Sequence, residues 1–185
     1  MAPLLSPEYQ ALNRQLHVER KDYGAKGATS APKIVQLARQ NGLKVILDYG
    51  CGKGTLKPAV EAAAPELTVL EYDPAIPGKD TIPEVPVDIV AALDVMEHVE
   101  PDHLDDVLRS MAATGAKCVY MLVATSPASK ILADGRNAHL IVQPKAWWQE
   151  QFGRYFKQVY ELQHEARFIY IGATRRDIPP EQLNS

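Results

Sequence analysis

Short apolar runs alternate along the chain with segments in which apolar residues recur at helical spacing. Four runs have the length and composition of buried parallel strands; they are residues 44–49, 67–72, 87–93 and 117–123. Helices with apolar side chains three and four positions apart are expected to begin near Ser6, Ser30, Thr55, Pro101 and Pro144. This alternation predicts an α/β fold with a mostly parallel sheet. In such a sheet the ligand binds beyond the C-terminal ends of the strands.

Two regions depart from the alternation. Residues 158–163 and 167–173 are consecutive strand-like runs joined by a tight turn, which predicts a C-terminal antiparallel hairpin. Residues 75–86 contain three prolines and a glycine, so they leave room for an extended linker with at most a stub of strand near residues 79–82. The sheet is therefore expected to be shortened after its second strand.

Length and composition indicate an ordinary globular protein with a single domain. With 185 residues, 46% apolar and 23% charged, the chain is long enough to bury a core. We expect N-terminal helices and a possible lid in residues 1–43, the core in residues 44–174 and a polar tail in residues 175–185.

Charge and targeting signals limit the binding partners and the cellular location that we expect. The net charge of −3 argues against an extended nucleic-acid surface. No apolar run reaches membrane-spanning length, and the N-terminus has no signal-peptide pattern, so we predict a cytoplasmic protein without a membrane partner. Cys51 and Cys118 are too far apart for a metal-type spacing and are expected to be reduced. The sequence does not indicate an oligomeric state.

The segment with the clearest chemistry is residues 44–55, KVILDYGCGKGT. An apolar strand ends on Asp48, and alternating glycines, Gly50, Gly52 and Gly54, lead into a helix. A strand, a glycine turn and a helix N-terminus together are typical of nucleotide-type sites. Thr55 stands where a dinucleotide fold has its third glycine, and the loop lacks the Gly-Lys-Ser/Thr of a phosphate-gripping loop.

Two carboxylates suggest which nucleotide-like molecule this loop holds. Asp48 would repel a pyrophosphate, but it suits a ligand that carries an ammonium group. Asp73 follows the second strand and is placed to accept hydrogen bonds from ribose hydroxyls. A ribose and a cation without a phosphate clamp predict S-adenosylmethionine.

Three segments together resemble the class I S-adenosylmethionine-dependent methyltransferases. They are DYGCGKG (residues 48–54), LEYDP (70–74) and VDIVAALDVMEHVEP (87–101). The third is similar to a segment of small-molecule and ubiquinone-type O-methyltransferases, and the whole resembles compact, phage-borne members. The resemblance spans about residues 23–174. It implies a Rossmann-like fold, S-adenosyl-L-methionine as cofactor and S-adenosyl-L-homocysteine as product.

The resemblance also implies roles for individual residues. Asp48, Gly50 and Gly52 would line the methionine portion of the cofactor, Asp73 would bind its ribose, Leu93 and Asp94 would lie near the sulfonium, and Tyr23 would close over the site. Only fifteen positions separate Asp73 from Asp88, where the family usually fits a helix and a third strand. Ile76 and Asp80 are therefore the nearest candidates for contacting the adenine.

The histidines admit more than one interpretation. His139 is a candidate general base for an acceptor hydroxyl, because imidazole titrates near neutral pH. His98 is a second candidate catalytic residue, although a local structural role beside the cofactor is the simpler interpretation. We predict no metal; a divalent ion bound by Glu97, His98 and His139 remains the open alternative.

These features predict a methyltransferase whose acceptor is not identified, with a hydroxyl of a small molecule or sugar favoured. A nucleic-acid or nucleotide acceptor is the first alternative. A cofactor-binding module without catalysis is the second, and a nicotinamide enzyme is the third.

Overall fold

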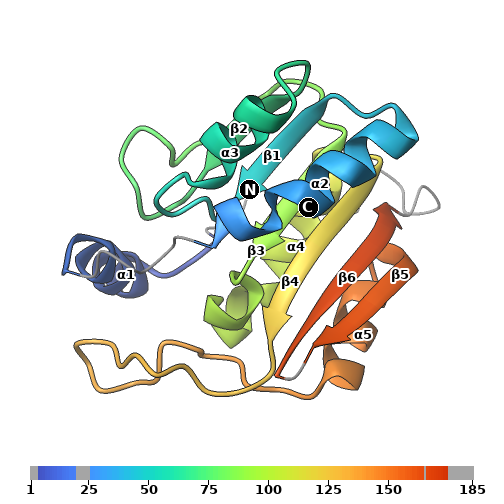
Figure 1. Ribbon diagram of the computed structural model, residues 1–185. Helices are drawn as coiled ribbons and strands as arrows, with labels where there is room; N and C mark the ends of the chain where they lie inside the picture. Colours follow the sequence, from blue (N-terminus) through green and yellow to red (C-terminus); the bar gives the residue numbers. More distant parts are fainter. Residues whose placement is uncertain (1–3, 20–25, 165, 175–185) are drawn as a thin grey trace.

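The computed structural model describes residues 4–19, 26–164 and 166–174. Within them, one six-stranded sheet runs through the molecule in the order β2-β1-β3-β4-β6-β5 (Figure 1). The strands are β1 (Val45–Tyr49), β2 (Thr68–Tyr72), β3 (Ile89–Leu93), β4 (Cys118–Ala124), β5 (Phe156–His164) and β6 (Arg167–Thr174). The first four are parallel, and β6 is antiparallel to both of its neighbours. The predicted Rossmann-like sheet with a C-terminal hairpin is confirmed.

Helices cover both faces of the sheet. They are α1 (Pro7–Glu19), α2 (Gly27–Asn41), α3 (Leu56–Ala63), α4 (Leu104–Ala113) and α5 (Lys145–Gly153), with short 3-10 turns η1 (Met96–His98) and η2 (Pro101–His103) before α4. The α2–α3 pair packs on one face, and α4 and α5 pack on the other, whereas α1 lies to the side of the sheet (Figure 1). None of the helices in the described residues combines the length and apolar character that a membrane span requires.

The two cores follow from the two-residue period of a strand. In β3, every residue is buried; Ile89 and Ala91 belong to the core under α2 and α3. Val90 and Ala92 belong to the core under α4 and α5. A strand that is buried on both sides requires an unbroken apolar run, and this is the pattern that identified it.

The connection between β2 and β3 is short, as predicted. Residues 73–88 contain neither helix nor strand, so β2 is an edge of the sheet. The possible strand stub at residues 79–82 does not form, because the prolines on either side cannot donate ladder hydrogen bonds. The backbone instead turns back, with the Asp73 amide donating to the Lys79 carbonyl at 2.8 Å.

Some helix details differ from the prediction. The second helix begins at Gly27, ahead of the Ser30 start that we expected, and Pro32 lies inside it. Gly27 permits close packing on α3, since a Cβ there would come within 2.5 Å of the Leu56 amide nitrogen. At the end of α3, Ala63 is exposed and the next residue, Ala64, is buried.

Candidate functional site

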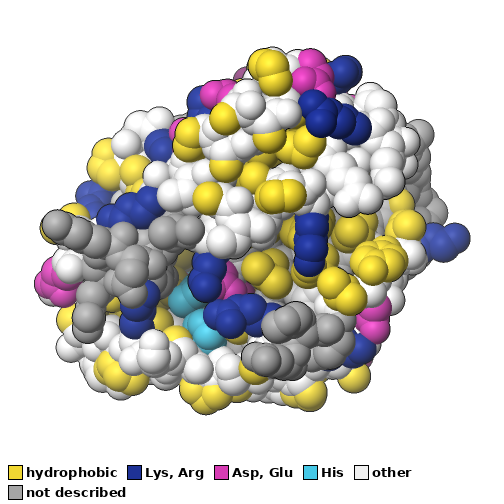
Figure 2. All heavy atoms as spheres, viewed as in Figure 1, with side chains coloured by type: hydrophobic (Ala, Val, Ile, Leu, Met, Phe, Trp, Pro, Cys, Tyr) yellow, Lys and Arg dark blue, Asp and Glu magenta, His cyan; other side chains and the backbone are white. Residues whose placement is uncertain are grey.

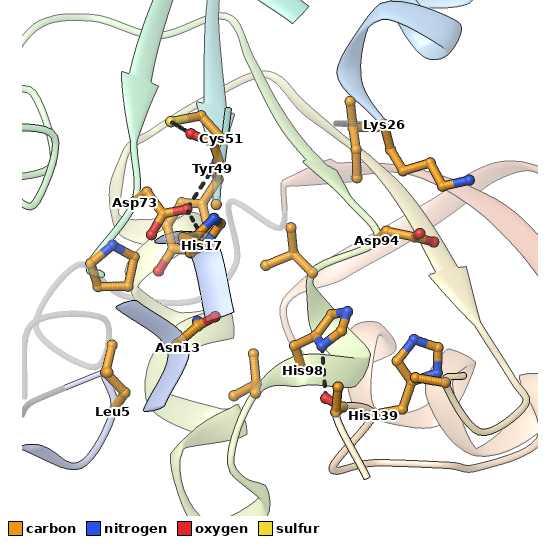
Figure 3. Close-up of a pocket in the computed structure, with 18 of the residues that line it drawn as sticks. Leu5, Asn13, His17, Lys26, Tyr49, Cys51, Asp73, Asp94, His98 and His139 are labelled. Carbon is orange, nitrogen blue, oxygen red and sulfur yellow. Dashed lines mark hydrogen bonds and ion pairs between the residues drawn. The ribbon is translucent and has the colours of Figure 1, made fainter. Parts of the chain in front are cut away.

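A cavity of about 580 Å³ opens at the C-terminal ends of the parallel strands (Figure 3). It is lined by most of the residues that the sequence singled out: Asp48, Gly50, Gly52, Asp73, Leu93, Asp94, His98 and His139. Ile76 and Asp80 do not line it, and Tyr23 lies outside the described residues. Segments far apart in the chain therefore converge where the topology requires.

The glycine loop is fixed against the end of β2. The amides of Gly50 and Cys51 both donate to the Tyr72 carbonyl, at 2.7 and 3.0 Å. Gly50 and Gly52 have positive φ angles of 75° and 51°, which disfavour other residues. A Cβ on Gly50 would also lie 2.7 Å from the Val95 side chain. The loop therefore leaves bare backbone facing the cavity.

Asp48 is a buried carboxyl group with unused hydrogen-bonding capacity. Its exposed fraction is 3%, and its Oδ2 atom has no hydrogen-bond partner in the described part of the chain. Burial, followed by the charge of Glu71, raises the pKa of Asp48 to about 7. An ammonium group bound here would supply both the missing partner and the compensating charge, so the residues present fit the methionine end of S-adenosylmethionine.

Asp73, the residue predicted to bind the ribose, is held rigidly at the cavity wall. Its two oxygens accept hydrogen bonds from the amides of Ala75 and Gly52, each at 2.9 Å. A carboxylate oxygen has two acceptor positions, so capacity for ribose hydroxyls remains. His17 of α1 places its Nε2 atom 3.9 Å from Asp73 Oδ2, on the same side of the cavity (Figure 3).

Helix α1 is tied to both sides of the cavity mouth. The Tyr9 hydroxyl donates to the His98 carbonyl, and the side-chain amide (Nε2) of Gln10 donates to the Pro74 carbonyl, both at 2.6 Å. Arg14 Nε donates to the Ala75 carbonyl at 3.3 Å. The sequence did not indicate that α1 docks beside the site. Helical spacing shows which face of a helix is buried, but it does not show which part of the molecule covers that face.

Asp94 is the only described residue other than glycine with a positive φ, which is 59°. Aspartate adopts this left-handed conformation more readily than most residues, and residues other than glycine in it often lie at functional sites. Its amide donates to the Leu122 carbonyl at 2.9 Å, and its carboxylate pairs with Arg167 Nε and Nη2 at 3.0 and 3.4 Å. Arg167, at the start of β6, was missed in the sequence because 73 positions separate it from Asp94.

The two predicted histidines lie together on the other side of the cavity from Asp73 (Figure 3). Their rings meet edge to face, with centroids 4.8 Å apart. His98 Nδ1 bonds to the Ala138 carbonyl at 2.7 Å, and His139 Nδ1 bonds to the Ser126 carbonyl at 2.6 Å. A carbonyl oxygen only accepts hydrogen bonds, so each Nδ1 carries the proton and each neutral ring has its lone pair on Nε2.

The surroundings of His98 keep its imidazole uncharged. Burial, followed by the neighbouring His139, lowers the pKa of His98 to about 4, so His98 is neutral at ordinary pH. Its hydrogen bond to the loop agrees with the simpler interpretation, in which it shapes the cavity.

Glu97 is fully buried beside this pair but does not line the cavity. Its Oε1 accepts the Ala124 amide at 2.7 Å, and its Oε2 has no hydrogen-bond partner among the described residues. Burial, followed by the charge of Asp94, raises the pKa of Glu97 to about 8. Within residues 4–19, 26–164 and 166–174, no group of three or more His, Cys, Asp or Glu side chains is arranged to hold a metal ion. The geometry thus gives no support to the metal alternative.

Comparisons with known proteins agree on the kind of domain. The family model described as "Methyltransferase domain" matches residues 23–165. Among curated proteins, no match is found. The resemblance to phage-borne members is tested by neither comparison and stays a prediction.

Solved structures share the fold. The 1,6-didemethyltoxoflavin-N1-methyltransferase of Burkholderia thailandensis, with 1,6-didemethyltoxoflavin and S-adenosylhomocysteine bound, gives a TM-score of 0.64 at 18% identity over 94% of this chain and 92% of its own. The PH0226 protein of Pyrococcus horikoshii OT3 gives 0.62 at 12% identity, covering 92% and 100%. Magnesium protoporphyrin IX methyltransferase of Synechocystis PCC 6803, with S-adenosylhomocysteine bound, gives 0.58 at 13%, covering 89% and 94%.

Proposed function

The chain belongs to the methyltransferase domain family and is an S-adenosylmethionine-dependent methyltransferase; from this premise we propose that it methylates a hydroxyl group of a small molecule. Within the proposal, Asp48 and the backbone at Gly50 and Gly52 hold the methionine portion of the cofactor. Asp73 holds the ribose, and Leu93 and Asp94 lie beside the reacting centre. When bound, the cofactor supplies an activated methyl group on a cationic sulfur, which keeps the electron pair of the broken bond, so S-adenosylhomocysteine is the product.

The observation that carries the hydroxyl assignment is the setting of His139. Its Nδ1 is anchored on the Ser126 carbonyl, which leaves Nε2 as the proton acceptor. The residue lines the same cavity as Asp48 and Asp73. A hydroxyl group bound there can give its proton to Nε2 as the oxygen becomes methylated.

His98 acts in this proposal as a positioning residue. Its ring packs edge-on against His139 and is tied to the Ala138 carbonyl next to it in the chain. Because its lowered pKa keeps His98 uncharged, it does not oppose the positive charge that His139 acquires on accepting a proton. Packing against His98 fixes His139, the proposed base, in one orientation. Orientation is a large part of catalysis when the methyl donor is already activated.

The test is methyl transfer from labelled cofactor to a small-molecule extract, with His139→Ala compared with wild type. We expect kcat to fall about 100-fold, the usual contribution of a general base, while the Kd for S-adenosylhomocysteine stays within about twofold. His103→Ala is the matched control, because His103 pairs with Glu100 and does not line the cavity. Equal losses of turnover and cofactor affinity in His139→Ala would contradict the assignment.

A further inference from the structure

An ion pair lies beside the glycine loop but outside the cavity. Lys79 Nζ is 3.0 Å from Glu71 Oε1, and neither residue lines the cavity. A Cβ on Gly54, whose φ is 67°, would overlap Glu71 Oε1 and lie 2.9 Å from Lys79 Nζ. The pair therefore contacts the backbone of the loop directly, and a glycine at this position leaves room for it.

Glu71 reaches the loop because of the register between β1 and β2. Asp48 and Glu71 are neighbours across these two parallel strands, so their side chains leave the sheet on the same face. Two positions earlier on each strand, Ile46 and Val69 belong to the core under α2 and α3. Glu71 thus continues that face of the sheet to the point where the glycine loop leads into α3.

Lys79 is brought to the same place by the short connection between β2 and β3. Its carbonyl accepts the Asp73 amide at 2.8 Å, and its own amide donates to the Ile76 carbonyl at 3.0 Å. The backbone of Lys79 is therefore bonded to Asp73, the residue proposed to hold the ribose, and its side chain turns toward Glu71.

Most ion pairs at a protein surface contribute little, because water screens them. Figure 2 shows Lys or Arg side chains beside Asp or Glu side chains at several places on one face of the molecule. The Glu71–Lys79 pair differs, since its side chains are 19% and 30% exposed and it lies close to a buried carboxyl group, that of Asp48. Charges in such a partly desolvated setting act on one another more strongly than in water.

The groups that face Asp48 act on it in opposite directions. Burial is the main cause that raises the pKa of Asp48 to about 7, and the charges of Glu71 and Asp73 raise it further, whereas that of Lys79 lowers it. The Cys51 thiol is uncharged, because burial raises its pKa to about 12. Lys79 therefore opposes two carboxylates by favouring the ionised form of Asp48.

We propose that Lys79 is a positioning residue for cofactor binding: held by Glu71 against the glycine loop, it keeps the Asp48 carboxylate charged for the ammonium group of S-adenosylmethionine. The inference rests on the proposed function for the placement of that ammonium at Asp48. A neutral carboxyl group accepts a hydrogen bond but supplies no opposite charge, so affinity depends on the ionised form. Because Glu71 has the opposite influence, the pair sets the pH above which the cofactor binds tightly.

The charge of Asp48 can be measured without cofactor. The carboxyl carbon of Asp48 is followed by NMR as pH is varied, and its resonance is identified by its loss in Asp48→Asn. We expect the titration midpoint to move from about pH 7 in wild type to about pH 8 in Lys79→Met and to about pH 6 in Glu71→Gln. Opposite shifts distinguish the loss of a charge from general damage to the loop.

Lys117→Met is the matched control. Lys117 forms an ion pair with Asp88 at 2.9 Å where β3 and β4 begin, at the other end of the strands, and neither residue lines the cavity. This variant also removes a lysine from an ion pair, so it should leave the Asp48 midpoint unchanged.

Calorimetry with S-adenosylhomocysteine tests whether the cofactor uses this charge. At about pH 6, we expect the Kd of Lys79→Met to be about tenfold higher than that of wild type, and the Kd of Glu71→Gln to be about fivefold lower. At about pH 8, where Asp48 is mostly ionised in wild type, the three proteins should agree within about twofold.

Two outcomes would overturn the inference. One is an Asp48 midpoint that does not move in opposite directions in Lys79→Met and Glu71→Gln. The other is a Kd at about pH 6 that stays the same in both variants although Asp48→Asn weakens binding. Failure of the proposed function is a separate result: normal affinity of Asp48→Asn for S-adenosylhomocysteine would remove the ammonium from Asp48, whatever the two midpoints do.

Discussion

The two ends of the cavity are built in different ways. The cofactor end consists of backbone and carboxylates: the glycine loop is bonded to Tyr72, and Asp73 is fixed by two amides. The other end, where we propose that the acceptor binds, contains the imidazoles of His98 and His139, each of which bonds to a carbonyl of the loop after β4. The first end suits a ligand whose structure never changes, whereas the second can be altered one side chain at a time. This difference explains why the cofactor is recognised more readily than the acceptor.

The largest effect is expected when a side chain is added at the cofactor end, where backbone lines the cavity. Gly50→Ala places a Cβ 2.7 Å from Val95 at a φ of 75°, so we expect a loss of about 3 kcal/mol in the free energy of unfolding and little binding of S-adenosylhomocysteine. Gly78→Ala is the control, because Gly78 has a φ of 83° but a Cβ added there would meet no atom within 4 Å. Urea unfolding and calorimetry measure both quantities; equal behaviour of the two variants would show that the close approach to Val95 is unimportant.

A smaller change removes only the charge at the cofactor end. Asp48→Asn keeps the size of the side chain, and we expect it to weaken S-adenosylhomocysteine binding by about 100-fold, because the ammonium loses a charged, desolvated partner. Stability without ligand should stay the same or rise, since the carboxyl group is buried and one of its oxygens has no hydrogen-bond partner among the described residues.

Calorimetry and thermal unfolding are the measurements for Asp48→Asn. A variant that binds S-adenosylhomocysteine normally would show that Asp48 does not meet the ammonium.

The mildest test concerns Glu97, behind the acceptor end. Because the pKa of Glu97 is about 8 in the fold and near 4.3 in an unfolded chain, its stabilising protonated form is lost as pH rises toward 8. His98 changes in the opposite sense, but only below about pH 6.5, where the unfolded histidine takes up its proton. The contribution of Glu97 to stability should therefore fall by about 1–2 kcal/mol between pH 6.5 and 8.5.

The measurement is urea unfolding at several pH values without cofactor. Glu97→Gln keeps an oxygen to accept the Ala124 amide but cannot ionise, so its stability should fall less steeply than that of wild type; the remaining fall comes from Asp48, whose pKa is about 7. Wild type and variant with the same pH dependence would contradict this account of Glu97.

The sequence predicted the features that depend on residues close together in the chain, namely the strands, their ends and the turns. The apolar runs located the strands, and the order of strand ends brought Asp48, Asp73 and Asp94 to one cavity. Turn chemistry correctly excluded a helix and a full strand from residues 75–86.

What the sequence did not reveal depends on packing between distant segments. His17 reaches Asp73 only because of where α1 docks, and Arg167 reaches Asp94 only because β6 is inserted beside β4. The early start of α2 at Gly27 follows from close contact with Leu56, a requirement that shows only when both helices are placed.

The tethering of α1 has a consequence for the order in which the chain is assembled. Its hydrogen bonds to His98, Pro74 and Ala75 join residues that are 89, 64 and 61 positions apart. The acceptor groups follow β2 and β3, so they come within reach of one helix only after both strands have paired with β1. Contacts of such long sequence separation carry a large loop-closure entropy and form late. The mouth of the cavity is therefore expected to form late in folding, after the strands of the sheet have paired.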